Sequence, residues 1–125
     1  MILDTNALSA FVDGDPDLAL VLARAPQLAL PVIVLGEFRF GIAGSRHRAT
    51  YADWLEAHLR DFDVLHVTET TAATYADVRV MLRRSGTPIP ANDAWIAALA
   101  LQHRLPVVSR DGHFDAVPGL RRSTW

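Results

Sequence analysis

Residues 2–6 read ILDTN, an apolar pair followed at once by a carboxylate, a hydroxyl and an amide. Residues 1–4 predict a short buried strand, because a brief apolar run bounded by polar residues is typical of strands in parallel sheets. Asp4 therefore stands just past the apolar part of a strand. A charge at that point either caps a following helix or belongs to a functional site, and the rest of the sequence must distinguish the two.

Strands and helices alternate along the remainder of the chain. Further strands are predicted at residues 27–31, 63–67, 105–109 and 120–125, the last at a sheet edge, and helices at 6–12, 16–25, 32–44, 48–62, 69–86 and 93–104, the last capped by Asn92. This alternation predicts an α/β fold around a small, mainly parallel sheet. Because the sequence has no internal repeat, linker or low-complexity segment, we expect residues 1–125 to form one domain.

Composition excludes several kinds of chemistry. Half of the 125 residues are hydrophobic and 21% are charged, which is typical of a globular protein. The sequence has no cysteine, so it offers neither a thiolate nucleophile nor a cysteine metal site. All 12 basic residues are arginine, which excludes any mechanism that requires a lysine. The net charge of −2 gives no overall indication of a nucleic-acid partner.

Targeting signals are not evident in the sequence. The first residues do not form a basic segment followed by an apolar one, and the longest apolar runs are shorter than a bilayer requires. We therefore expect a cytoplasmic protein without a membrane anchor.

Four carboxylates are the candidate functional residues of this predicted α/β fold. Asp4 follows the first strand and Asp111 follows the strand at 105–109, so both belong to the sheet edge where open α/β sheets bind ligands. Asp93 is expected in the first turn of its helix, and Glu37 lies in an apolar helical segment. Carboxylates gathered at one point repel one another, and a hard divalent cation such as Mg²⁺ or Mn²⁺ relieves that repulsion.

Each of these carboxylates also has an ordinary structural interpretation. Asp4 could cap the helix that begins at Asn6, and Asp93 could supply the acidic first turn of its own helix. Glu37 could face solvent, and Asp111 could belong to a turn. One acidic metal site accounts for all four positions together more simply than four separate coincidences do.

Four segments resemble, in order along the chain, the acidic motifs of PIN-domain nucleases. They are ILDTN (2–6), GEFRFG (36–41), NDAWIAA (92–98) and SRDGHF (109–114). With the carboxyl-terminal VPGLRRSTW (117–125), they resemble more narrowly the VapC-type toxins of bacterial type II (VapBC) toxin–antitoxin pairs. The resemblance covers nearly the whole chain and implies a PIN-like three-layer α/β/α sandwich.

The resemblance implies a metal-dependent endoribonuclease that hydrolyses phosphodiester bonds of tRNA, rRNA or mRNA, with Mg²⁺ or Mn²⁺ as its cofactor. The positions that match the family's catalytic and metal-binding acids are Asp4, Glu37, Asp93 and Asp111. The positions that match the polar residues supporting those acids are Thr5, Asn6, Asn92 and Ser109. The resemblance also implies a homodimer and a cognate VapB-type antitoxin that neutralises the toxin.

An RNA substrate must also be held through its phosphates, and arginines are the available donors. Arg39, Arg46 and Arg110 are the candidates for these contacts. His113 could approach the acidic site, but no two histidines have the spacing of metal ligands, so we expect the histidines to be bystanders. Asp115 could be a fifth acid, although a turn or surface role is the preferred interpretation. Whether one or two ions act is left open.

Rival classes agree less well with the sequence. Two-component receiver domains and haloacid-dehalogenase phosphatases also place aspartates at strand ends around Mg²⁺, but both need a lysine near the phosphoryl group. A flap-type DNA nuclease would need extra acids and a helical arch that 125 residues do not supply. The remaining alternative is a PIN-like module that binds RNA or protein without cutting, and four intact acids argue against it.

Overall fold

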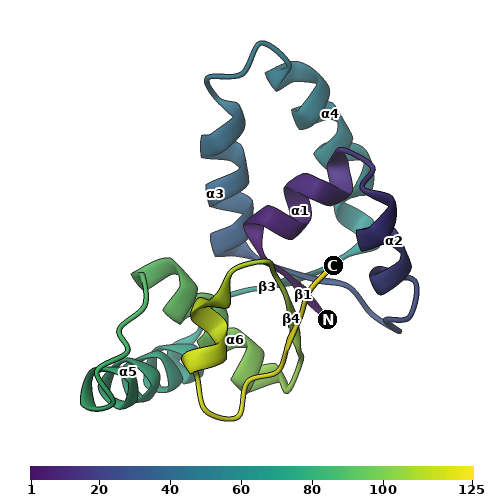
Figure 1. The fold of residues 1–125 in the computed structure, drawn as a ribbon. Coiled ribbons are helices and arrows are strands. Elements are labelled where there is room, and N and C mark those ends of the chain that lie inside the picture. Colours follow the sequence, from purple (N-terminus) through teal and green to yellow (C-terminus); the bar gives the residue numbers. More distant parts are fainter.

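Five short strands form one parallel sheet at the centre of the structure, a computed structural model that describes residues 1–125 (Figure 1). The strands are β1 (Ile2–Leu3), β2 (Ala29–Pro31), β3 (Asp63–Leu65), β4 (Val107–Val108) and β5 (Arg122–Ser123). Their order is β3-β2-β1-β4-β5, and every neighbouring pair is parallel. All five predicted strands are present in shorter form, and β5 lies at an edge as predicted.

Helices cover both faces of this sheet, which confirms the three-layer α/β/α arrangement (Figure 1). One face carries α1 (Thr5–Val12), α2 (Pro16–Leu22), α3 (Val32–Ile42) and α4 (Arg48–His58), and the other carries α5 (Glu69–Arg84) and α6 (Ala91–His103). Two 3₁₀ turns, η1 (Leu59–Asp61) and η2 (Gly112–Ala116), complete the chain. No helix combines the length and the apolarity needed to cross a bilayer.

The strand order reverses beside β1, which is the place where open α/β sheets form a ligand-binding crevice. From β1 the chain passes into α1 and α2 and on to β2, whereas β4 is reached from α5 and α6 on the opposite face. From β1 the chain therefore builds the sheet outward in one direction, to β2 and β3, and from β4 in the other direction, to β5. Open α/β sheets bind ligands at such a switch point, beyond the carboxyl ends of the strands. Asp4 follows β1 at this point and Ser109 follows β4.

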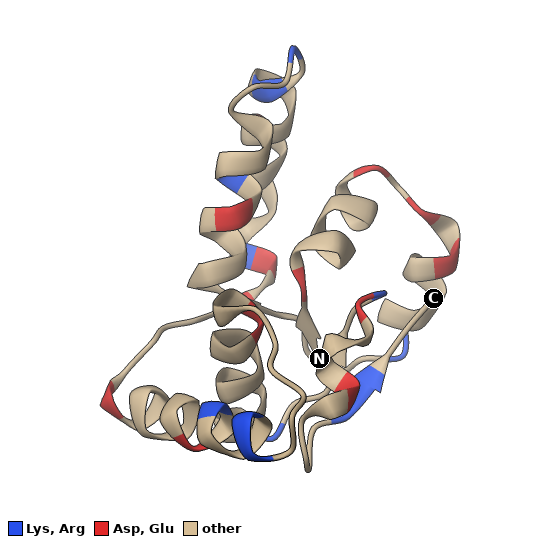
Figure 2. Ribbon diagram, turned by 60° about the vertical axis from the view of Figure 1, so that its left-hand side comes forward, with Lys and Arg blue, Asp and Glu red and all other residues tan.

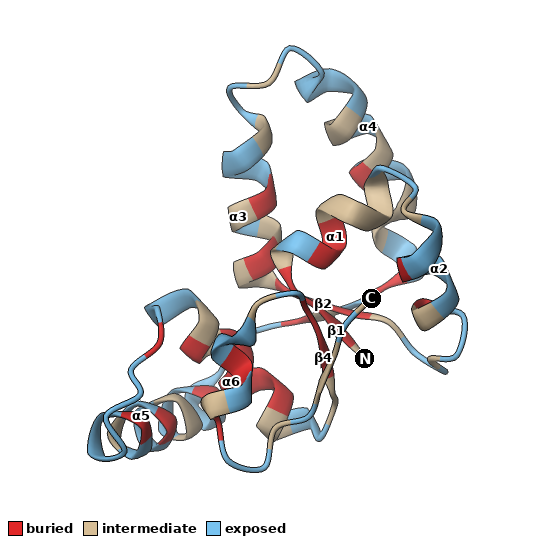
Figure 3. Cartoon of the chain, in the orientation of Figure 1, coloured by how far each residue is buried: buried red, intermediate tan, exposed pale blue.

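The core explains why the central strands are continuously apolar. Ile2, Leu3, Val107 and Val108 are all fully buried, because helices cover the sheet on both sides (Figure 3). They belong to a single cluster of 25 buried residues that also includes most of the middle of α6. This packing holds β1, β4 and α6, the three elements that lead into the crevice, in a fixed relation.

Most helix boundaries agree with the sequence prediction, but the start of α6 does not. The helix begins at Ala91 with Pro90 at its N-cap, so the prediction that Asn92 caps it is wrong. The fixed backbone angle of proline suits it to the start of a helix, and Asn92 consequently lies in the first turn. Gly86 ends the α5 segment as predicted, with a positive φ of 71° that glycine adopts without strain.

The predicted helix 48–62 is also shorter than expected. The α-helix ends at His58, and residues 59–61 tighten into η1 before β3 begins. A 3₁₀ turn is common at the end of an α-helix, and here it brings Phe62 into the core.

Replacing Leu99 of α6 with alanine is expected to lower the free energy of unfolding by about 2–5 kcal/mol, because the fully buried side chain would leave a cavity. Chemical denaturation measures this change. Leu20→Ala on α2 is the matched control, since Leu20 is 68% exposed and should change stability by less than about 0.5 kcal/mol. Equal losses in the two variants would contradict the described core.

Candidate functional site

Asp4 is the most buried acid of the crevice, with only 4% of its surface exposed. Its Oδ1 accepts the backbone N–H of Thr5 at 2.7 Å, which makes Asp4 the N-cap of α1. The capping interpretation is therefore right, and it leaves the second carboxylate oxygen for other contacts. Burial raises the pKa of Asp4 above its usual value, and the charges of Asp93 and Glu37 raise it further.

Ser109 and Asn6 hold that second oxygen of Asp4. Oδ2 accepts the Ser109 hydroxyl at 2.7 Å and the Asn6 amide at 3.0 Å. The Ser109 oxygen in turn accepts the Asn6 amide at 3.2 Å and the backbone N–H of Asp111 at 2.9 Å. Ser109, fully buried, thus joins the aspartate that follows β1 to the one that follows β4.

Glu37 reaches the same crevice from α3 and is held from two sides. Its Oε2 accepts the hydroxyl of Thr5, and its Oε1 accepts the side-chain amide of Asn92 at 2.6 Å. Thr5 is the residue next to Asp4, and Asn92 is the residue next to Asp93. The glutamate therefore links the start of α1 to the start of α6, instead of facing solvent on the outside of α3.

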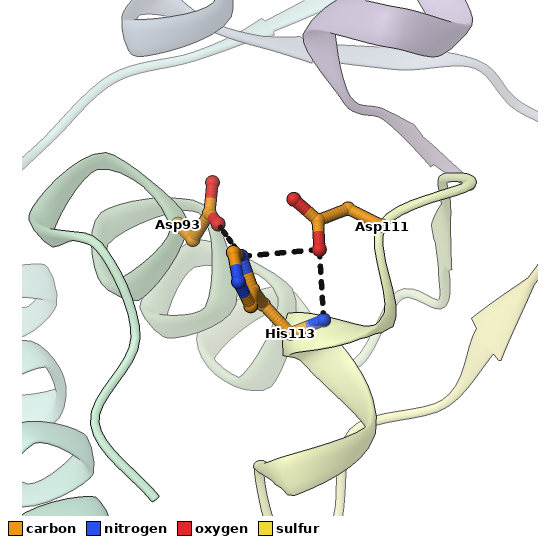
Figure 4. A group of neighbouring side chains, drawn as sticks. All are labelled: Asp93, Asp111 and His113. Carbon is orange, nitrogen blue, oxygen red and sulfur yellow. Dashed lines mark hydrogen bonds and ion pairs between the residues drawn. The ribbon is translucent and has the colours of Figure 1, made fainter.

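Asp93, Asp111 and His113 form the open side of the site (Figure 4). His113 Nδ1 lies 2.9 Å from Asp93 Oδ2 and 3.0 Å from Asp111 Oδ1. The ring is placed by a tight turn, because Asp111 Oδ1 also accepts the backbone N–H of His113 at 2.9 Å. An imidazolium at this point would partly neutralise both carboxylates.

The pKa values of this group follow from those contacts. Burial raises the pKa of Asp93, and the charges of Asp111 and Glu37 add to the rise, while hydrogen bonding to His113 opposes it. The hydrogen bond to Asp93, followed by the charge of Asp111, raises the pKa of His113 above its usual value. Both shifts favour protonated groups, as expected where several acids lie close together.

The structure thus brings together all four predicted acids and all four predicted supporting residues. It also brings in His113, which the sequence analysis expected to be a bystander. That residue could not have been selected from spacing, because its contact with Asp93 joins the turn after β4 to the start of α6. The only available signal was its position two residues after Asp111.

None of the three candidate RNA-binding arginines forms an ion pair with the four acids. Arg39 Nη2 lies 3.3 Å from Glu56 on α4, and Arg46 is exposed in the connection between α3 and α4. Arg110 lies beside Asp15 and Trp125. Figure 2 shows basic positions at the tip of the α3–α4 hairpin, along α5 and on β5.

Asp115 is not part of the acidic group. It is paired with Arg122 through two hydrogen bonds of 2.8 and 2.7 Å.

The donor set fits a divalent cation. Side-chain oxygens and one imidazole nitrogen from Asp93, Asp111 and His113 all lie within 4.8 Å of one another. Glu37 is close enough to Asp4 and to Asp93 for its charge to raise the pKa of both aspartates. Carboxylate oxygens are the preferred ligands of Mg²⁺ and Mn²⁺, and a bound cation would remove this repulsion.

The chain matches a known domain family over nearly its whole length. The PIN domain family model matches residues 1–120. The sequence is 35% identical over 122 residues to Ribonuclease VapC5 of Mycobacterium tuberculosis, an alignment that covers 94% of this chain and 87% of the relative. It is 31% identical over 121 residues to VapC ribonuclease Y4jK of Sinorhizobium fredii, covering 89% and 86%.

Solved structures share the fold over nearly the whole chain. FitAcB from Neisseria gonorrhoeae superposes with a TM-score of 0.85 at 30% identity, covering 97% of this chain and 94% of the other. DNA-bound VapBC from Salmonella typhimurium superposes with a TM-score of 0.87 at 25% identity, covering 99% and 96%.

Without metal, the protein is expected to lose stability as the pH rises through the pKa of His113. Because folding raises this pKa, the protonated ring contributes its full stability below the unfolded value of 6.5, and the contribution disappears at higher pH. Melting temperatures in EDTA from about pH 6 to pH 9 measure the effect. His113→Gln should show a shallower decline, and parallel profiles would contradict the ion pairs with Asp93 and Asp111.

Proposed function

Since the chain belongs to the PIN-domain family and, within it, to the VapC ribonucleases, we propose that it is a toxin endoribonuclease that hydrolyses RNA phosphodiester bonds with a divalent cation. The substrate class is tRNA, rRNA or mRNA, and the cation is Mg²⁺ or Mn²⁺. A cognate VapB-type antitoxin neutralises the activity.

The observation that supports this proposal best is the hydrogen-bonded group around Asp4. Burying a carboxylate lowers the stability of the fold unless hydrogen bonds or an opposite charge compensate. Acids with raised pKa values, such as Asp4, are therefore found most often at functional sites. Asp4 accepts three hydrogen bonds and faces two further acids across the crevice. This arrangement is suited to holding a cation that the protein itself does not supply.

Each residue has a distinct proposed role. Asp4, Asp93 and Asp111 hold the cation, and Glu37 holds a second one or orients the attacking water. When bound, one or two such ions activate water and stabilise negative charge on the phosphate. Supporting residues restrict the acids to one arrangement, as outer-shell groups do in metal sites generally, and they are Thr5, Asn6, Asn92 and Ser109.

We propose two roles for His113. In the metal-free protein its protonated ring balances Asp93 and Asp111. Its nitrogen is also a possible ligand, and nitrogen donors favour Mn²⁺ over Mg²⁺ more than oxygen donors do. Arg46, exposed and without an ion pair in the structure, is the clearest of the three candidate arginines for a contact with RNA phosphate.

The proposed partners follow from the family. The VapBC proteins and FitAcB that share this fold were solved as complexes, and we propose that this chain likewise binds a cognate antitoxin and forms a homodimer. We propose a single PIN domain over residues 1–125 and a cytoplasmic location, where the RNA substrate is found.

Purified protein is expected to cut a total-RNA or tRNA pool into discrete products with Mg²⁺ or Mn²⁺ and to leave it intact in EDTA. Asp4→Asn and Asp93→Asn should each lower the cleavage rate at least about 100-fold, because each removes a charge needed to hold the cation. Sequencing the products would identify the RNA.

Asp53→Asn is the matched control for these two variants. Asp53 lies exposed on α4, away from the acidic group, so the same change of charge should leave cleavage unaltered. Cleavage that survives both site substitutions would contradict the assignment of the site. Intact RNA under every metal condition, from folded protein free of antitoxin, would favour a non-cleaving RNA- or protein-binding module.

Expression of the chain alone is expected to arrest bacterial growth, and co-expression of the antitoxin gene should relieve the arrest. Asp93→Asn should be harmless at the same protein level, because cleavage and toxicity depend on the same site. Growth curves with immunoblots for protein level measure this. Equal toxicity of Asp93→Asn and the natural sequence would contradict an enzymatic origin of the arrest.

A further inference from the structure

A cluster of three side chains lies beside the acidic group and takes no direct part in it. The guanidinium carbon of Arg110 lies 4.4 Å above the ring of Trp125, a cation–π geometry. Asp15 Oδ2 accepts the Trp125 indole N–H at 3.0 Å and lies 3.3 Å from Arg110 Nη2. One carboxylate oxygen therefore joins the tryptophan to the arginine that stacks on it.

Asp15 fixes the same cluster to α2. Its other oxygen, Oδ1, accepts the backbone N–H groups of Asp17 at 3.0 Å and Leu18 at 3.1 Å, so Asp15 is the N-cap of that helix. The two oxygens have separate contacts, one with the helix and one with the cluster. As a result the start of α2, the residue after Ser109 and Trp125 meet at a single side chain.

Arg110 extends the cluster into the acidic group. Its backbone N–H donates to Asn6 Oδ1 at 3.2 Å. With its oxygen held in this way, the Asn6 amide points its N–H groups at Asp4 Oδ2 and the Ser109 hydroxyl, at 3.0 and 3.2 Å. The orientation of Asn6, and with it one hydrogen bond to Asp4, therefore depends on where the Arg110 backbone lies.

The segment that ends in Trp125 also holds the chain on the other side of Arg110. The Ser109 N–H donates to Ser123 O at 2.9 Å, and Arg122 Nη1 donates to Ser109 O at 3.0 Å. These contacts fix the backbone of Ser109 by the pairing of β4 with β5. The tryptophan and Asp15 fix the next residue, Arg110, where that pairing has ended.

We propose that Asp15, Arg110 and Trp125 form a positioning clamp for the metal site, acting through Asn6 on Asp4 and Ser109. The inference rests on the proposed metal-binding function. Asp15 and Trp125 are positioning residues, since neither contacts an acid of the site. Tryptophan suits this place because one side chain supplies both an aromatic face for a guanidinium and an N–H for a carboxylate.

Trp125→Ala tests the clamp with two readouts. The first is the side-chain amide resonance of Asn6 in ¹H–¹⁵N spectra of the metal-free protein, which should shift or broaden when Arg110 is released. The second is Mn²⁺ affinity by calorimetry, at a temperature where the variant is fully folded, which should weaken by about 10-fold, the lower end of the range for outer-shell changes.

Two further comparisons separate positioning from simple packing. Trp125→Phe keeps a ring under Arg110 and should restore part of the affinity. Asp15→Asn should reproduce the effect of Trp125→Ala, while Asp17→Asn, which makes the same change of charge on an exposed residue two positions away, should leave both readouts unchanged.

A lower melting temperature of Trp125→Ala with an unchanged Asn6 resonance and unchanged Mn²⁺ affinity would overturn the proposal, because the cluster would then only stabilise the fold. If the natural chain binds no Mn²⁺, the proposed function fails, and the Asn6 resonance then decides alone whether the clamp controls Asn6.

Discussion

The candidate site is organised around the buried carboxylate of Asp4. It lies at the carboxyl end of the central strand, where it caps α1 and stays almost entirely out of water. A carboxylate in such a place must be hydrogen bonded and balanced by positive charge, or its pKa rises and it neutralises. Ser109 and Asn6 supply hydrogen bonds but no positive charge, and the nearby acids Asp93 and Glu37 add further negative charge.

The fold gathers these negative charges at one point. Because β1 and β4 are neighbours with helices on opposite faces, the residues that follow them converge with the start of α6 and one side of α3. Polar side chains adjacent in sequence to the acids then hold their neighbours, as Thr5 and Asn92 hold Glu37. His113 Nδ1 lies between the carboxylates of Asp93 and Asp111, and these two contacts raise the pKa of His113.

Sequence reasoning could place Asp4, Asp93 and Asp111, because each stands at an element end that apolar runs and capping residues predict. Glu37 lies in the middle of α3, and only the resemblance of its segment to a PIN-domain motif indicated its role. The alternation of strands and helices was enough to assign Asp4 and Asp111 to the same sheet edge. It could not place His113, whose contact with Asp93 depends on the curvature of a 3₁₀ turn. It also misjudged Asn92, because residue preference favours asparagine at a cap while the backbone of Pro90 takes that position.

We propose that Asp4 lies at the carboxyl end of β1 because it holds a cation there. Anomalous diffraction from crystals soaked in Mn²⁺ would locate that cation. We expect an anomalous peak among the carboxylates of Asp4, Asp93 and Asp111, at about 2.1 Å from a carboxylate oxygen, by analogy with Mg²⁺. A fully soaked crystal without a peak in this crevice, or with one that leaves Asp4 uncontacted even through water, would contradict it.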